Sequence, residues 1–126
     1  MKRVFLKAKL HRAVVTSVEI DYEGSCAIDE NLMIAADILE YEMLHIYNIN
    51  NGKRFTTYAI KSTANSGIIS FNGAAAHKAD IGDKVIICTY AEYKKSAYKK
   101  YKPKLVYLDD LNHITHTKHK IYPQIS

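Results

Sequence analysis

The dipeptide Gly24-Ser25, inside the octet Tyr22-Glu23-Gly24-Ser25-Cys26-Ala27-Ile28-Asp29, could carry out chemistry on its own backbone. If the chain bends so that the Ser25 hydroxyl faces the preceding carbonyl, Oγ can attack Gly24 and convert the amide to an ester. β-Elimination and hydrolysis of the resulting dehydroalanine would leave a ketone, a pyruvoyl group, at a new N-terminus. Glycine suits this step because a residue without Cβ reaches strained dihedral angles at low cost. Most Gly-Ser pairs are ordinary turns, so the dipeptide alone does not decide the function.

A second group of polar residues lies in the strand expected over 53–60, after the turn signal Asn51-Gly52. Arg54 and Tyr58 share one face of that strand, whereas Thr57 points to the other. An arginine binds a carboxylate through two parallel hydrogen bonds, which a lysine cannot do in one plane. A surface arginine and a half-buried sheet tyrosine are the simpler interpretations when these residues are taken alone.

Lys9 and His11 form a third candidate group, because they share one face of a strand expected within residues 3–18. From the residues alone, a solvated pair on an exposed face is the simpler interpretation of these two side chains. A cation beside Arg54 would be a second contact for a carboxylate.

Short elements must position these groups. We expect two strands in 3–18, further strands at 43–48, 53–60, 68–71, 84–90 and 105–108, a helix at 30–36 with Asp29 as N-cap, and a helical turn from 74. The segment 84–90 is apolar enough to be buried on both faces. Many short strands with frequent turn signals predict a small closed β-barrel.

The chain of 126 residues is expected to be a single domain with a formal net charge of +5. Six lysines lie between residues 94 and 104, a stretch without any acid, so the remainder carries 5 − 6 = −1. The basic character therefore belongs to one segment. This weakens, without removing, the alternative of a small β-barrel that binds nucleic acid through the Lys/Tyr segment 93–104.

The C-terminal part is harder to assign. Tyr93, Ala97, Tyr98 and Tyr101 follow a rough helical stripe that Pro103 would end. The triplet His113, His116 and His119 has a spacing that could hold a metal, but a mobile polar tail over 110–126 is the favoured interpretation.

Cys26 and Cys88 do not form a disulfide framework, and Lys7 and Lys9 interrupt the apolar N-terminus as no signal peptide would allow. No apolar run is long enough to span a bilayer. We therefore expect a cytoplasmic protein without a membrane partner.

Four motifs in order closely resemble the aspartate 1-decarboxylases: Lys9-Leu10-His11-Arg12, YEGSCAID at 22–29, NGKRFTTYAI at 51–60 and NGAAAH at 72–77. The resemblance runs from about residue 1 to residue 90. It implies pyruvoyl-dependent decarboxylation of L-aspartate to β-alanine and CO2 for pantothenate and coenzyme A biosynthesis. It also implies a mainly β fold, a small closed six-stranded double-psi β-barrel with short helices, and a homotetramer with active sites between subunits.

The resemblance further assigns roles to residues. Cleavage between Gly24 and Ser25, helped by Thr57, would give a 1–24 β chain and a 25–126 α chain. The pyruvoyl group from Ser25 would be the covalent cofactor, forming a Schiff base with the substrate, with Tyr58 as proton donor and with neither a metal nor pyridoxal phosphate. The implied substrate-binding residues are Lys9, His11, Tyr22, Arg54, Thr57, Asn72, Gly73, Ala74 and Ala75. A maturation factor and an inactive relative that never cleaves are left open, and no nucleic-acid partner is expected.

Overall fold

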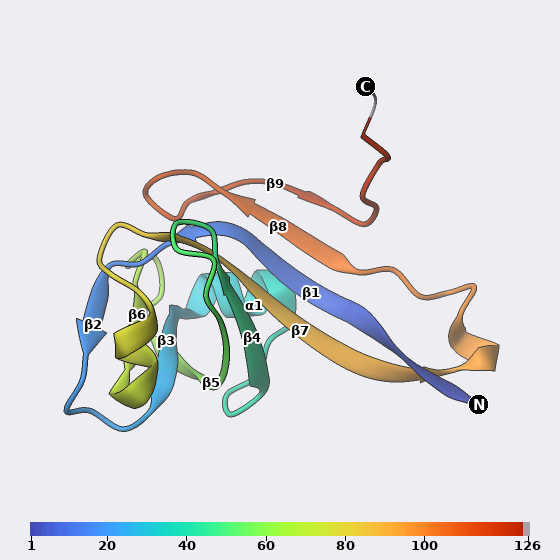
Figure 1. The fold of residues 1–126 in the computed structure, drawn as a ribbon. Helices are drawn as coiled ribbons and strands as arrows, with labels where there is room; N and C mark the ends of the chain where they lie inside the picture. Colours follow the sequence, from blue (N-terminus) through green and yellow to red (C-terminus); the bar gives the residue numbers. More distant parts are fainter. Residues whose placement is uncertain (125–126) are drawn as a thin grey trace.

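A computed structural model describes residues 1–124 as a single mainly β unit with short helices (Figure 1). Its elements are β1 Lys2–Val14, β2 Ser17–Glu19, β3 Ser25–Asp29, α1 Glu30–Ala36, β4 Met43–Asn48, β5 Arg54–Ser62, β6 Ile69–Asn72, η1 Gly73–Lys78, β7 Lys84–Lys94, η2 Lys95–Ala97, β8 Lys104–Leu108 and β9 Ile114–Lys118. The expected mainly β class with short helices is confirmed.

The sheet curls back on itself. Its strand order is β2-β6-β3-β5-β4-β7-β1-β8-β9. The first strand of that order, β2, is the direct continuation of β1 through Val15 and Thr16. Val15 N donates to Asp83 O at 2.9 Å and Thr16 N to Ile69 O at 2.8 Å, which ties this junction to both flanks. Counting β1 and β2 as one bent strand, six strands therefore close a ring, and β8 and β9 extend it outward.

Side chains that point inward at every second position of the strands fill the interior of the ring. Ala8 and Leu10 of β1, Leu44 of β4 and Ile87 of β7 are fully buried, as an inward-facing period of two requires. The short helix α1 adds Leu32, Met33 and Ala36 to this core. The outward-facing residues of the same strands are more exposed, and Lys9 and His11 of β1 are among them.

The predicted helix and its N-cap are confirmed. The Asp29 side chain accepts a hydrogen bond from Asn31 N, satisfying a free amide of the first turn. The same carboxylate accepts from Asn65 N and Gly67 N, so it also fixes the loop before β6. Because β3 leads directly into this capped helix, the end of β3 is anchored, and Ser25 lies at its other end.

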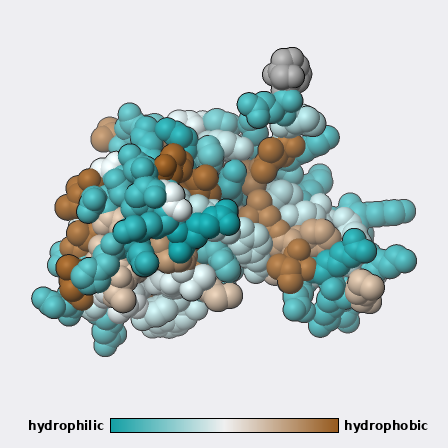
Figure 2. Space-filling view, in the orientation of Figure 1, coloured by the Kyte–Doolittle hydropathy of each residue, from teal (hydrophilic) through white to brown (hydrophobic). Residues whose placement is uncertain are grey.

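The helical stripe predicted over 93–101 is wrong. β7 continues to Lys94, pairs with β1 as an antiparallel arm that projects from the body, and is followed by the short 3₁₀ helix η2 (Figure 1). Tyr93, Tyr98 and Tyr101 instead gather around Phe5, with ring centroids 5.8, 5.1 and 4.8 Å from it. The tyrosine spacing thus reflects packing onto β1, and the projecting end presents mainly hydrophilic side chains (Figure 2).

The strand predicted over 105–108 is confirmed as β8, but it is not the last strand. Residues 114–118 form β9, which pairs with β8 and which the sequence does not predict. Mobility of the tail stays a prediction, and its residues 125–126 lie outside the described part. The three histidines have different neighbours: His116 stacks on Tyr107, His113 lies beside Asp109, and His119 faces Pro103 O. Of the helices in residues 1–124, none has the length and apolar character needed to cross a membrane.

Candidate active site

Ser25, the first residue of β3, is buried and its hydroxyl has two partners. It donates to Glu23 O at 3.0 Å and accepts from Asn72 Nδ2 at 2.9 Å. Asn72 lies directly opposite Ser25 in the antiparallel β3–β6 pair. Asn72 Oδ1 in turn accepts from the Ser70 hydroxyl at 3.0 Å. The Ser25 hydroxyl is therefore held in one orientation beside the Gly24–Ser25 peptide bond.

Gly73 packs directly against Gly24. A Cβ on Gly73 would lie 2.7 Å from Gly24 Cα and 2.8 Å from Gly24 N, closer than any real contact. Gly73 also has a φ of +66°, which favours glycine, whereas Gly24 is not among the described residues with positive φ. The backbone conformation that requires glycine is thus found at Gly73 and not at Gly24. We call Glu23, Gly24, Ser25, Ser70, Asn72 and Gly73 the Ser25 centre.

The register of β3 and β5 brings Tyr58 level with Ser25. Cys26 pairs with Ala59, and both are fully buried, so the residues before them face outward. Thr57, the residue before Tyr58, lies on the opposite face of β5, which shows no bulge in its pairing with β4. Burial raises the pKa of the Cys26 thiol, which keeps this neighbour protonated.

Arg54 lies four residues before Tyr58, about 13 Å along β5. Its guanidinium carbon is 4.5 Å from the centre of the Tyr47 ring, its partner in the β4–β5 pair. The Tyr47 and Tyr90 hydroxyls are 2.6 Å apart, and the Tyr90 ring meets His45 edge-on at 5.0 Å. Burial, reinforced by Tyr47, raises the pKa of Tyr90, so the Tyr90 hydroxyl stays protonated at neutral pH. We call Arg54, Tyr47, Tyr90 and His45 the Arg54 face.

An open groove of about 430 Å³ lies beside the Arg54 face. It is lined by Val4, Met43, His45, Tyr47, Tyr90, Ala91 and Glu92. The groove runs over the outer side of β4 and β7, where these strands meet the start of the arm. Arg54 therefore stacks on a tyrosine that is itself part of a groove wall.

Lys9 and His11 share a face, as predicted, because Ala8 and Leu10 between and beside them are buried. Lys9 is level with Cys88, which is level with His45 across β1, β7 and β4. Lys9 therefore belongs to the same side of the sheet as the Arg54 face, with β7 and β4 lying between its strand and β5. His11 instead turns toward Tyr107, with ring centroids 5.1 Å apart and its Nδ1 buried without a hydrogen-bond partner among the described residues.

The other predicted site residues surround Gly24 to different degrees. Tyr22 contributes its carbonyl, 3.1 Å from the Cβ position of Gly73, while its side chain is exposed. Ala74 is exposed and Ala75 is half-buried against the core, both in η1 directly after Gly73. One chain thus gathers Ser25, Asn72, Gly73 and Tyr58, and keeps Lys9, His11 and Arg54 apart from them.

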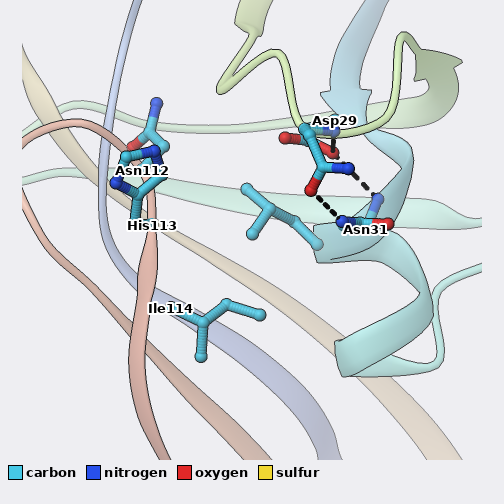
Figure 3. A pocket seen from close by; sticks show the side chains of 7 residues that line it. Asp29, Asn31, Asn112, His113 and Ile114 are labelled. Atoms are coloured by element: carbon cyan, nitrogen blue, oxygen red, sulfur yellow. Dashed lines mark hydrogen bonds between the residues drawn. The ribbon is translucent and has the colours of Figure 1, made fainter.

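A separate polar pocket of about 250 Å³ lies beside the first turn of α1 (Figure 3). Asp29 and Asn31 form one side, and Asn112, His113 and Ile114 the other. Asn112 donates to Val14 O and Gly67 O and accepts from Val14 N, and Asp29 is used equally fully. Because these polar groups already bind loop backbones, we interpret the pocket as a place where loops are held together and not as a ligand site.

Comparisons with known proteins identify the family. Residues 1–115 match the model of a family described as aspartate decarboxylase. The "Aspartate 1-decarboxylase" of Nitrosococcus oceani is 59% identical over 126 residues, covering 100% of both chains. That of Methylobacillus flagellatus is 59% identical over 121 residues, 96% of each chain. The similarity therefore reaches well past residue 90, where the resemblance seen in the sequence alone ended.

A rationally designed protein is also similar in structure, with a TM-score of 0.47 and 10% identity, covering 61% of this chain and 90% of that one. That likeness is too low to carry an argument. The fold and the Ser25 centre define a small β protein built around a Gly-Ser bond. By its sequence, the chain belongs to the aspartate decarboxylase family.

Proposed function

We propose that this chain cleaves itself between Gly24 and Ser25 and then decarboxylates L-aspartate to β-alanine and CO2, the reaction that supplies pantothenate biosynthesis. The observation that carries the proposal is the Ser25 centre, in which a buried serine hydroxyl is oriented by Asn72 while Gly73 packs against Gly24. Membership of the aspartate decarboxylase family gives this arrangement its reaction.

Self-cleavage needs few groups. Ser25 Oγ bonds to the Gly24 carbonyl carbon, the Gly24–Ser25 C–N bond breaks, and the hydroxyl proton ends on the Ser25 nitrogen. β-Elimination then releases Gly24 as a carboxylate, and hydrolysis of the dehydroalanine releases ammonia. Asn72 Nδ2, 2.9 Å from Oγ, stabilises charge that develops on this oxygen. Thr57, one residue before Tyr58 on β5, is proposed to donate to the Gly24 carbonyl.

The fit of a pyruvoyl group rests on the same geometry, because residue 25 is buried, hydrogen-bonded and flanked by Tyr58. When formed, the group supplies a ketone that binds the substrate amine and an electron sink for the loss of CO2. The Tyr58 hydroxyl then gives a proton to the carbon that has lost CO2. Arg54 binds the carboxylate that stays, with Lys9 as a second cation. Tyr22, Asn72, Gly73, Ala74 and Ala75 line the pocket, and His11 supports it from the side.

A homotetramer with sites between subunits is part of the proposal. In one chain, Tyr58 is 36% exposed and Met43 beside it is 60% exposed, on an open sheet face. Arg54 is about 13 Å of strand away from Tyr58 in the same chain. Decarboxylation benefits from a site that excludes water. A neighbouring subunit that covers this face would supply the missing wall, and could bring its own Arg54 or Lys9 to Ser25.

The alternative of nucleic-acid binding through segment 93–104 loses its main support. Stacking of bases needs free aromatic faces. Tyr93, Tyr98 and Tyr101 are half-buried and packed on Phe5. The lysines of the arm remain exposed, but without the rings they offer only charge. A cytoplasmic location and a maturation factor stay predictions.

An intact mass spectrum of the denatured protein tests the proposal. We expect two species, residues 1–24 and a 25–126 chain blocked by a pyruvoyl group, followed by β-alanine formation from aspartate. Ser25→Ala should give one full-length species and no β-alanine, whereas Ser96→Ala, an exposed serine on the arm, should behave as wild type. A wild-type chain that stays full-length after prolonged heating would overturn the proposal.

A further inference from the structure

Four polar groups around the Gly24–Ser25 bond form one directed chain of hydrogen bonds. The Ser70 hydroxyl donates to Asn72 Oδ1 at 3.0 Å, Asn72 Nδ2 donates to Ser25 Oγ at 2.9 Å, and Ser25 Oγ donates to Glu23 O at 3.0 Å. Ser25, Ser70 and Asn72 are 1%, 5% and 3% exposed, so water does not compete for these groups. Among the side chains of this hydrogen-bond chain, Ser70 is the one to which the proposed mechanism gives no role.

The direction of the chain follows from the number of protons available. Ser25 has a single hydroxyl proton, which Glu23 O accepts. The Asn72 atom that faces Ser25 must then be a donor, Nδ2, and this sets Oδ1 toward Ser70. Without the Ser70 proton, Oδ1 would be a buried acceptor with no partner, and the amide could turn over and offer its oxygen to Ser25.

We propose that Ser70 is a positioning residue for self-cleavage, acting through Asn72. This inference rests on the proposed function, since it concerns the same bond. Ser70 holds the Asn72 amide with its N–H toward Ser25 Oγ, and its hydrogen bond polarises that amide and strengthens it as a donor. The N–H is needed as Oγ loses its proton to the departing Ser25 nitrogen and attacks Gly24.

The sheet explains why Ser70 can do this. Ser70 and Asn72 are two residues apart on β6, so their side chains leave on the same face. They pair with Ala27 and Ser25 on β3, respectively. Alanine lies opposite Ser70 on β3, and Ser17 lies level with it on β2, but the Asn72 oxygen is the side-chain partner that its hydroxyl binds among the described residues.

The test compares the rate at which full-length protein disappears, followed by intact mass, in Ser70→Ala, Asn72→Ala and the double variant. Loss of a hydrogen bond worth about 0.5–1.5 kcal/mol corresponds to a slowing of about 2- to 12-fold for Ser70→Ala. In the Asn72→Ala background, Ser70→Ala should cause no further slowing, because its effect passes through the missing amide. Incubation at raised temperature keeps the slow background measurable.

Thr89→Val is the matched control, because Thr89 is fully buried and its hydroxyl has no partner among the described residues. It should cleave at the wild-type rate. Melting temperatures are compared in a Ser25→Ala background, where no variant can cleave, so that a general loss of stability is recognised. Cleavage of Ser70→Ala at the rate of Thr89→Val, or equal slowing by Ser70→Ala with and without Asn72, would overturn the inference while leaving self-cleavage intact. A wild-type chain that never cleaves overturns both.

Discussion

The Ser25 centre and the Arg54 face differ in how complete they are within one chain. Within the Ser25 centre, Ser25, Ser70 and Asn72 are buried, their polar groups bind one another, and a close glycine–glycine contact fixes the backbone. The Arg54 face is open: the Arg54 guanidinium lies over the Tyr47 ring, and it forms no ion pair with a carboxylate among residues 1–124. The proposed cleavage is a reaction of the chain on itself, whereas the proposed substrate binding needs an external carboxylate. If these assignments hold, the two regions separate self-processing from turnover, and substitutions should separate them too.

The largest effect is expected for Gly73→Ala. The new Cβ would meet Gly24 at 2.7 Å and push it away from Ser25 Oγ. A displacement of about 1 Å can cost about 100-fold in rate, so cleavage should nearly stop. Gly52→Ala is the control, because Gly52 has a similar φ of +75° but open space around it. Equal cleavage rates in the two variants, measured by intact mass, would show that the contact does not matter.

Arg54→Ala should affect turnover alone. Loss of a charge-assisted pair, worth about 1.5–3 kcal/mol, raises the KM for aspartate by about 10- to 100-fold, while cleavage proceeds at the wild-type rate. Arg54→Lys should restore only part of the affinity for aspartate, because lysine cannot form two parallel hydrogen bonds with a carboxylate. Lys53→Ala removes a neighbouring exposed cation as the control. Slower cleavage in Arg54→Ala would contradict this separation, because Arg54 would then contribute to self-cleavage as well as to substrate binding.

Tyr90→Phe tests a weaker link within the Arg54 face. It removes the hydroxyl that holds Tyr47 but keeps the ring beside His45. Tyr47 should then hold Arg54 less well, and KM should rise by about twofold to fivefold with little change in kcat. Tyr93→Phe, in the aromatic cluster of the arm, is the control. A fall in kcat with unchanged KM would contradict a role in substrate binding.

The smallest effect concerns pH. Burial, followed by the charges of Lys9 and Arg12, lowers the pKa of His11 below its ordinary value of 6.5. The unfolded chain therefore binds the proton more readily, and stability is lost as the pH falls below about 6.5. His11→Gln should reduce the drop in melting temperature between about pH 7.5 and about pH 5.5. His77→Gln, an exposed histidine in η1, should leave that drop unchanged.

The local features of the fold could be predicted from the sequence. Asp29 as a cap, the helix after it, and the strands at 43–48 and 105–108 depend on neighbouring residues, and the structure agrees. The segment 93–101 could not, because its tyrosines pack onto Phe5, which is far away in the sequence, and strand pairing overrides a helical spacing. β9 was missed because its pairing partner, and no pattern of its own, defines it.

The same division holds for the candidate site. Motifs indicated Ser25, Asn72, Gly73, Tyr58 and Arg54, but not which of them share a pocket, since that depends on register. Ser70 carries a usable signal, because it stands two residues before Asn72 on a predicted strand. Tyr47 and Tyr90 carry none, because their hydroxyls meet only when β4 and β7 pair.

The bent strand formed by β1 and β2 affects how the protein can refold after cleavage. A cut after Gly24 would leave residues 1–24 woven into the ring, with β1 between β7 and β8 and β2 against β6. The two fragments would stay together without a covalent link. Refolding from denaturant, unimolecular before the cut, would then require two chains to meet and would depend on their concentration. Unfolding of the cleaved protein would thus be much harder to reverse than unfolding of the uncleaved chain, because the two fragments separate when the protein melts.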